Sequence, residues 1–151
     1  MNRSSVNIPA NVPDEMKDTY VDNYLQFTKG TGNGFLFAGD QRIEHLNDDF
    51  TGPEVAADDQ DPEHFFRIAS QSPVGCFAAQ HGLISRYARD YPQVPYLVKM
   101  NSRTKLVPGE PLSIAHVDMA DVLTLRENGV NVIGIGYTIY IGSKHELLML
   151  E

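Results

Sequence analysis

The 151-residue chain contains one cysteine, no tryptophan and too few cations to balance its acidic groups. A single thiol cannot form a disulfide within one chain, which excludes a disulfide-stabilised scaffold and is compatible with a reducing, cytoplasmic location. Lys and Arg number 12 against 20 Asp and Glu, so the formal net charge is −8. This balance disfavours a nucleic-acid-binding surface. It does not exclude a phosphorylated substrate, because a few local cations and helix N-termini can hold one phosphate.

Long apolar runs and metal-binding spacings are also missing. No run approaches the roughly 18 residues of a membrane span, and the first residues lack the apolar core of a signal peptide, so no membrane partner is expected. The five histidines are scattered without the spacing of a zinc motif. We therefore expect no protein-held metal and no cofactor.

What the chain does contain is four short, nearly continuous apolar segments, typical of strands buried on both faces of a parallel sheet. They are residues 34–41, 73–80, 96–101 and 132–139. Segments with helix signals lie around and between them: residues 14–28, a helix starting at 61–63, and residues 82–90, 117–128 and 143–151. This alternation predicts an α/β fold with about four β/α units. Residues 1–33 are predicted to be an extension with one helix, its first 13 residues loose or wrapped over a partner, and residues 34–151 the main domain.

Two charged residues at these strands are the strongest candidates for chemistry. Asp40 ends the first apolar segment, where a carboxylate could act as a general acid/base or could be a structural turn residue. Lys99 lies between Val98 and Met100, so its ammonium must meet a carboxylate, a phosphate or a substrate carbonyl. Desolvated lysines form Schiff bases. The alternative is a structural ion pair, for which Asp40 is a possible partner.

Three further polar residues are weaker candidates for substrate binding. His45 follows Asp40 in a polar loop, where a histidine could bind substrate, relay a proton or simply be solvated. Asn101 opens a polar stretch after the third strand that suits a phosphorylated ligand or a solvated loop. Tyr137 lies near the end of the fourth strand and could donate a phenolic hydrogen bond or belong to the core.

Three ordered segments of the chain resemble one known family. They are FAGDQRIEHLNDDF at residues 37–50, YLVKMNS at 96–102 and GYTIYIGS at 136–143. Together they resemble the archaeal-type class I fructose-bisphosphate aldolases, the DhnA-like branch of the DeoC/LacD superfamily. Shorter members carry Asp-His-Gly where this chain has Asp40-Gln41-Arg42, and longer members look more like this chain. The resemblance implies the N-terminal portion of a (β/α)₈ TIM barrel, because a complete barrel needs about 250 residues.

The resemblance also implies a reaction and roles. Family members cleave or form a carbon–carbon bond through a lysine Schiff base without a metal, and they are often ring-like homo-oligomers. Asp40 matches an aspartate implied to contact substrate and assist proton transfer, and Lys99 matches a supporting cation. The family's Schiff-base lysine lies on a later strand, so this chain alone is expected to lack full activity.

Two alternatives to a fructose-bisphosphate aldolase stay open from the sequence. One is a related synthase of aromatic biosynthesis, of the amino-dideoxy-heptulosonate type, which the motifs of the first half do not separate from an aldolase. The other is a noncatalytic half-barrel that binds a sugar phosphate or a protein partner.

Overall fold

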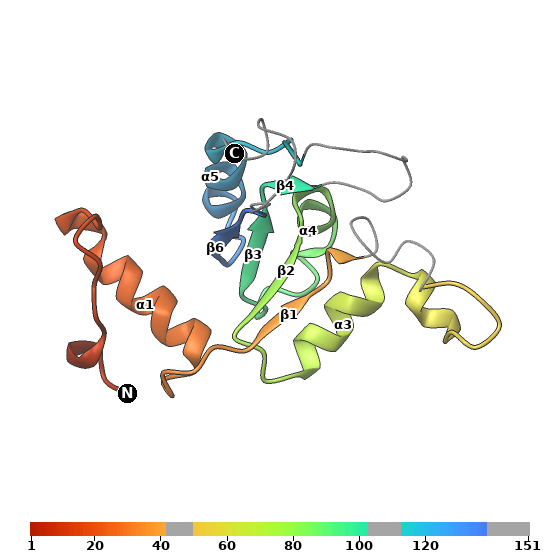
Figure 1. The fold of residues 1–151 in the computed structure, drawn as a ribbon, viewed down its shortest axis with the longest axis horizontal. Helices are drawn as coiled ribbons and strands as arrows, with labels where there is room; N and C mark the ends of the chain where they lie inside the picture. The colour runs from red at the N-terminus through yellow and green to blue at the C-terminus, as the bar shows by residue number, and fades with distance from the viewer. Residues whose placement is uncertain (42–49, 103–112, 139–151) are drawn as a thin grey trace, which may run out of the picture.

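A four-stranded parallel sheet in the order β1-β2-β3-β6 forms the centre of the protein (Figure 1). The computed structural model describes residues 1–41, 50–102 and 113–138. The strands are β1 (Leu36–Ala38), β2 (Cys76–Gln80), β3 (Tyr96–Lys99) and β6 (Val132–Gly136). The main helices are α1 (Lys17–Thr28), α3 (Glu63–Gln71), α4 (His81–Tyr87) and α5 (Met119–Glu127). The predicted α/β class with parallel strands is confirmed, while the segment predicted as a last helix, 143–151, lies outside the described residues.

Local signals in the sequence place the helix ends. Asp118 caps α5, and its side chain accepts a hydrogen bond from the backbone N–H of Asp121 at 3.0 Å. Gly129 follows α5 with a φ of +82°, a left-handed conformation that glycine adopts at low cost. Asp61 accepts a hydrogen bond from the N–H of Glu63 at the start of α3. The predicted starts of both helices are therefore correct to within about two residues.

One face of the sheet carries the hydrophobic core. Successive side chains of a strand point to opposite faces, so alternate residues of β2 and β3 meet the helices. The buried cluster joins α3, α4 and α5 to this face: Phe66, Ala69, Phe77, Ala79, Ile84, Tyr96, Val98, Val122, Leu125 and Val132. The Phe66 and Phe77 rings meet edge to face with centroids 4.9 Å apart. This packing fixes the sheet and leaves its opposite face available for a site.

The two outer strands correct the expectation that all four strands are buried on both faces. Every residue of β2 is buried, as predicted. Leu36 on β1 is 42% exposed and Ile135 on β6 is 47% exposed. The physical reason is that β1 and β6 each pair with only one neighbouring strand within the described residues.

The first 13 residues, predicted to be loose or wrapped over a partner, are tied to α1 of the same chain through Arg3. Arg3, in the short helix η1 (Arg3–Ser5), forms ion pairs with Asp18 and Asp22 of α1. A second short helix, η2 (Asp14–Met16), leads into α1. Figure 1 shows this N-terminal segment running beside α1.

Three further short elements were not predicted from the sequence. Helix η3 (Ala57–Gln60) precedes α3. Strands β4 (Asn101–Ser102) and β5 (Ile114–Ala115) form an antiparallel pair just beyond β3. The third apolar segment therefore divides into β3 and β4 instead of forming one strand to residue 101.

A glycine allows α1 to approach the sheet. A Cβ atom at Gly75, directly before β2, would lie 1.8 Å from the carbonyl oxygen of Phe27 in α1. Phe27 is the next-to-last residue of α1, and Gly75 directly precedes β2. The backbone of α1 is therefore in direct contact with the start of the sheet.

We expect Gly75→Ala to destabilise the protein by about 1–3 kcal/mol, because the added methyl group meets backbone atoms that cannot rotate away. Gly82→Ala is the matched control, since a Cβ at this α4 position meets nothing within 4 Å. It should stabilise by about 0.5–1 kcal/mol through helix propensity. Urea unfolding followed by circular dichroism measures both changes, and equal effects of the two variants would contradict the close approach.

The only cysteine lies beneath α1. Cys76 lines a cavity of about 240 Å³ between α1 and the sheet, together with Tyr24, Leu97 and Ile133. The residue is 1% exposed, and burial raises the pKa of its thiol from 9.0 to about 11. The neutral thiol is therefore the stable form in the folded protein at neutral pH.

Two consequences of this burial are measurable. At pH 8 iodoacetamide should modify Cys76 slowly in the folded protein and rapidly in urea, because the thiolate is the reactive form. The raised pKa also adds stability that is fully present below pH 9 and is lost as the pH rises through about 11. The Cys76→Ala variant should lose less stability between pH 8 and pH 10.5 than the unmodified chain. Identical pH profiles of stability for the variant and the unmodified chain would contradict a raised pKa of the Cys76 thiol.

Candidate active site at the carboxyl ends of the strands

Polar side chains follow one another across the strand ends, on the face of the sheet opposite the core. Gln80 of β2 is the register partner of Lys99 of β3, and Lys99 is in turn the partner of Gly136 of β6. Asp40 lies two residues beyond Ala38, which pairs with Ala78, so it continues the same row. The carboxyl ends of parallel strands are where α/β enzymes hold their ligands. The row Asp40, Gln80, Lys99 and Gly136 is therefore the candidate site.

The centre of the site is a buried ion pair. Nζ of Lys99 lies 2.7 Å from Oδ2 of Asp40, and the two side chains are 9% and 13% exposed. This geometry confirms the Lys99–Asp40 pairing that the sequence left as one alternative. The partners are 59 residues apart in the sequence, so the pairing depends on the tertiary fold. A charge held this far from water is stable only while its partner remains.

Two glycines next to the row are closely packed, Gly39 on the core face and Gly136 beside Lys99. Gly39 donates its N–H to the carbonyl of Ala78 at 2.8 Å, and a Cβ there would lie 2.3 Å from the Phe77 ring. A Cβ at Gly136 would lie 2.6 Å from Leu97 and 3.5 Å from the Lys99 side chain. Close packing accounts for both glycines.

Gln80 belongs to the site although the sequence analysis did not select it. Its Nε2 donates to the backbone carbonyl of Asp40 at 3.1 Å, and the residue is 7% exposed. The available signal was its place at the end of an apolar strand, the same signal that selected Asp40. In a glutamine this signal is weaker than in an aspartate, because the side chain carries no charge and does not titrate.

Asn101 is fully buried, with its side-chain amide directed to backbone groups. Its Nδ2 donates to the carbonyls of Ser113 at 3.3 Å and Thr138 at 2.9 Å. Its Oδ1 accepts from the N–H of Thr138 at 2.8 Å. These bonds join β4 to β5 and to the segment after β6. Contact between Asn101 and substrate stays a prediction.

Two other predicted residues are not brought to the ion pair. Tyr137 directly follows β6 and is 42% exposed, and within the described residues no hydrogen bond links its hydroxyl to Asp40 or Lys99. His45 lies outside the described residues. Substrate binding by either residue stays a prediction.

Comparison with known proteins identifies the family. Residues 35–151 match the model of the DeoC/LacD family aldolases. The chain belongs to this family. A Methanocaldococcus jannaschii relative, named fructose-bisphosphate aldolase/6-deoxy-5-ketofructose 1-phosphate synthase, is 52% identical over 153 residues, which cover 100% of this chain and 49% of the relative. A Thermoproteus tenax class 1 fructose-bisphosphate aldolase is 32% identical over 130 residues, 86% of this chain and 46% of its own length.

Solved structures of aldolases give the same result. A fructose-bisphosphate aldolase from Slackia heliotrinireducens superposes with a TM-score of 0.93 at 52% identity, covering 99% of this chain and 48% of that structure. A Schiff-base-forming fructose-1,6-bisphosphate aldolase, solved as reaction intermediates, has a TM-score of 0.68 at 29% identity, with 86% and 48% covered. The chain thus spans about half the length of these aldolases. This confirms the predicted N-terminal portion of a barrel.

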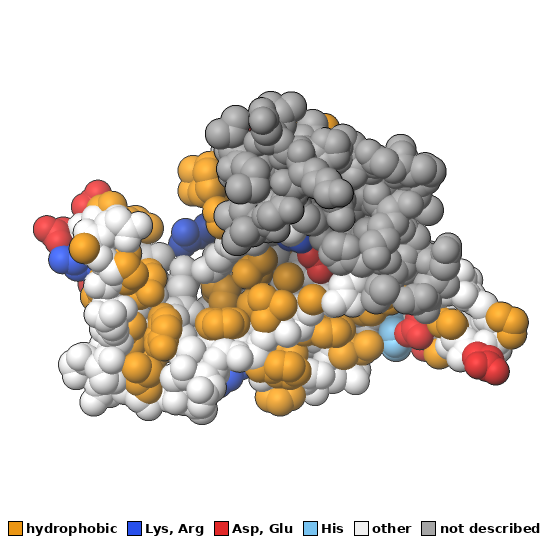
Figure 2. All heavy atoms as spheres, viewed as in Figure 1, with side chains coloured by type: hydrophobic (Ala, Val, Ile, Leu, Met, Phe, Trp, Pro, Cys, Tyr) orange, Lys and Arg blue, Asp and Glu red, His pale blue; other side chains and the backbone are white. Residues whose placement is uncertain are grey.

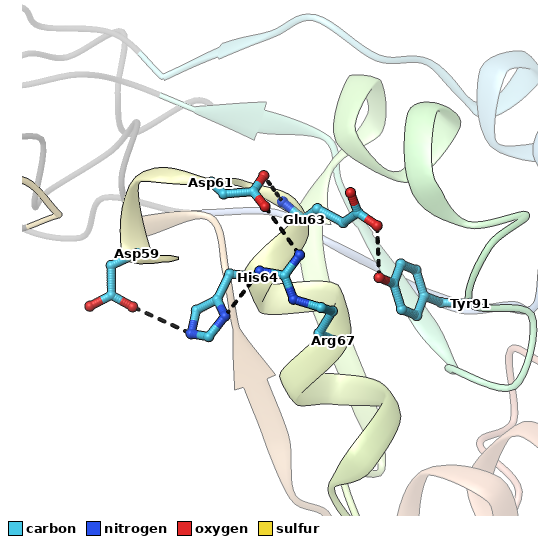
Figure 3. A network of polar contacts seen from close by, with 6 residues as sticks. All are labelled: Asp59, Asp61, Glu63, His64, Arg67 and Tyr91. Atoms are coloured by element: carbon cyan, nitrogen blue, oxygen red, sulfur yellow. Dashed lines mark hydrogen bonds and ion pairs between the residues drawn. The ribbon is translucent and has the colours of Figure 1, made fainter. Parts of the chain in front are cut away.

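A second polar cluster lies at the start of α3, after the loop that follows Asp40 (Figure 3). Arg67 contacts Asp61 at 3.1 Å and His64 at 3.4 Å, and the Tyr91 hydroxyl donates to Glu63 at 2.8 Å. The hydrogen bond from the N–H of Glu63, and to a smaller extent the hydrogen bond from Arg67, holds the pKa of Asp61 below its usual value. Every one of these groups serves another member of the cluster. We therefore infer that this cluster holds the start of α3 in place and does not take part in chemistry.

Metal-ligand clusters and membrane-spanning helices are both absent from the part of the chain that the structure describes. Within residues 1–41, 50–102 and 113–138, no three His, Cys, Asp or Glu residues are grouped to hold a metal ion. Among the same residues, no helix has the length and apolar character needed to cross a bilayer. Figure 2 shows instead that hydrophobic side chains gather over the sheet and along α1 on the viewed side.

The ion pair predicts the effect of removing its cation. Lys99→Met should destabilise the protein by about 3–5 kcal/mol, because it leaves the Asp40 carboxylate buried without this partner. Lys17→Met removes an exposed cation from its pair with Asp14 and should change stability by no more than about 0.5 kcal/mol. Urea unfolding measures both variants.

The double variant Asp40→Asn/Lys99→Met checks that the cost arises from the pair itself. It should regain part of the stability lost in Lys99→Met, because no charge is then left buried without its partner. A double variant as unstable as the sum of the two single variants would show that Asp40 and Lys99 contribute independently.

Proposed function

We propose that this site takes part in the class I aldolase reaction, the reversible cleavage of fructose 1,6-bisphosphate to dihydroxyacetone phosphate and glyceraldehyde 3-phosphate. The observation that supports it most strongly is the buried Asp40–Lys99 pair at the carboxyl ends of the strands, in a chain of the DeoC/LacD aldolase family. The relatives named as aldolases carry the same half of the fold. The substrate assignment extends their names to this chain.

Asp40 is proposed to handle the proton of the substrate hydroxyl. In retro-aldol cleavage the hydroxyl next to the breaking bond loses its proton and becomes the aldehyde, while the bonding electrons move to an iminium. A carboxylate fixed at the strand end suits this proton transfer, an effect typically worth 10²- to 10⁴-fold in rate. The close ammonium of Lys99 keeps Asp40 oriented and balances its charge.

Lys99 is proposed as a supporting cation and not as the Schiff-base lysine. A nucleophilic amine must be neutral, whereas the carboxylate 2.7 Å away favours the ammonium form. The iminium then forms on a different lysine, which the family resemblance places on a later strand of the barrel. Homo-oligomer formation and a cytoplasmic location stay predictions from the sequence.

A chimera tests the proposal directly. This chain would be joined to the half of the Methanocaldococcus jannaschii relative that it does not match, and fructose 1,6-bisphosphate cleavage would be measured. We expect activity, and we expect Asp40→Asn to lower kcat by about 10²- to 10⁴-fold. Asp58→Asn changes an exposed aspartate and should leave kcat unchanged. A folded but inactive chimera, or equal effects of the two substitutions, would refute the role of Asp40.

Borohydride reduction of the same chimera in the presence of dihydroxyacetone phosphate locates the iminium. The trapped adduct should map to a lysine of the added half. An adduct on Lys99 would show that this residue is the nucleophile and that its role as a supporting cation is wrong.

A second candidate is a carbon–carbon bond-forming synthase, because the Methanocaldococcus jannaschii relative is named for both aldolase and 6-deoxy-5-ketofructose 1-phosphate synthase activity. The amino-dideoxy-heptulosonate type of synthase that the sequence left open is a different member of this broad class. Product analysis by mass spectrometry, with the chimera and its substrates mixed, separates 6-deoxy-5-ketofructose 1-phosphate formation from simple cleavage.

A further inference from the structure

In the carboxamide of Gln80, the nitrogen forms a hydrogen bond and the oxygen forms none with the described residues. Its Nε2 donates to the Asp40 carbonyl at 3.1 Å. Its Oε1 is buried and accepts no hydrogen bond from any residue in the described part of the chain. A buried acceptor without a donor is destabilising, so such a group in a folded protein calls for a missing partner.

The orientation of the amide is determined by its neighbour. Exchanging the positions of the amide nitrogen and oxygen would place Oε1 against the carbonyl oxygen of Asp40, and two acceptors cannot share a hydrogen bond. Nε2 must therefore face Asp40, and Oε1 is the atom left over. The unmet need of Gln80 is accordingly for a hydrogen-bond donor.

The place of Gln80 in the sheet puts this residue in the candidate site. Gln80 lies in the same row as Asp40 and Lys99, as the register partner of Lys99, on the face opposite the helix-covered core. The only other buried side-chain atom without a partner in the described chain is Oγ of Ser113. Ser113 directly follows the undescribed range 103–112, whereas both chain neighbours of Gln80 are described.

We propose that Oε1 of Gln80 binds a hydroxyl group of the polyhydroxylated, phosphorylated substrate. The inference rests on the proposed function and adds a substrate-binding residue to it. A sugar hydroxyl is a neutral donor that matches a neutral amide acceptor, and Asp40 is then free to act on a neighbouring hydroxyl. The hydrogen bond from Nε2 to the Asp40 carbonyl couples the two groups, so the bound hydroxyl and the carboxylate keep a fixed relative position.

Two ligands separate hydroxyl recognition from phosphate recognition. Fructose 1,6-bisphosphate carries hydroxyls and two phosphates, and 1,6-hexanediol bisphosphate carries two phosphates and no free hydroxyl. In ¹H–¹⁵N spectra of the chain, the side-chain amide signals of Gln80 should shift with the first ligand and not with the second. This measurement needs no variant and so does not depend on the folding of one.

Variants of Gln80 then test the acceptor. Gln80→Met keeps the length of the side chain without the amide, and it should weaken fructose 1,6-bisphosphate binding about five- to tenfold while leaving hexanediol bisphosphate binding unchanged. Gln80→Glu keeps an acceptor oxygen but cannot donate to the Asp40 carbonyl. It should preserve the ratio of the two affinities, even if its charge weakens both. Gln93→Met, at an exposed glutamine, should change neither affinity.

The outcomes separate this inference from the function on which it rests. Loss of the affinity ratio in Gln80→Glu as well as Gln80→Met, or equal weakening of both ligands by Gln80→Met, would reduce Gln80 to a structural support of Asp40. Equal affinities of the unmodified chain for the two ligands would refute hydroxyl recognition and leave phosphate binding intact. Failure of the chain to bind either ligand would refute the proposed function of the site together with the inference.

Discussion

The buried ion pair between Asp40 and Lys99 is the interaction around which the carboxyl end of the sheet is arranged. An ammonium that is 9% exposed requires an anion, and the anion comes from a strand two positions away across the sheet. Gln80, on the strand between them, fixes the Asp40 backbone. Gly136, on the far side of Lys99, leaves room for the side chain of Leu97, which a Cβ there would meet at 2.6 Å. Charge, hydrogen bonding and close packing thus converge on one row.

The two faces of the sheet carry different kinds of residue: one packs the hydrophobic core and the other holds the polar site. The helix-covered face packs aromatic and aliphatic side chains such as Phe66, Phe77 and Tyr96. The opposite face is apolar near the strand starts, where Cys76 and Leu97 meet α1, and polar at the strand ends. Because residues alternate between faces, changing Phe77 or Tyr96 acts on the core, whereas changing Gln80 or Lys99 acts on the site and, for Lys99, on stability as well. The sheet therefore carries a packed core on one face and a polar row on the other.

Part of the fold and of the site was predictable from local sequence. Apolar runs gave the four parallel strands, Asp118 and Gly129 gave the limits of α5, and charged residues at apolar strands gave Asp40 and Lys99. Gln80 was missed because an uncharged strand-end residue has no local signal that distinguishes it from a structural amide. The antiparallel pair of β4 and β5 was missed because two-residue strands leave no periodicity to detect.

The sequence by itself determined the class of fold, because strand and helix periodicities and capping residues act within a few neighbours along the chain. It also determined which residues carried charges that needed partners. Only the tertiary structure decided which partners meet. Asp40 and Lys99 are 59 residues apart, and the parallel register of β1, β2 and β3 brings them within 2.7 Å. The same register leaves Gln80 between them with an acceptor that no residue in the described part of the chain satisfies, because the contacts of a side chain depend on strands that are distant in sequence.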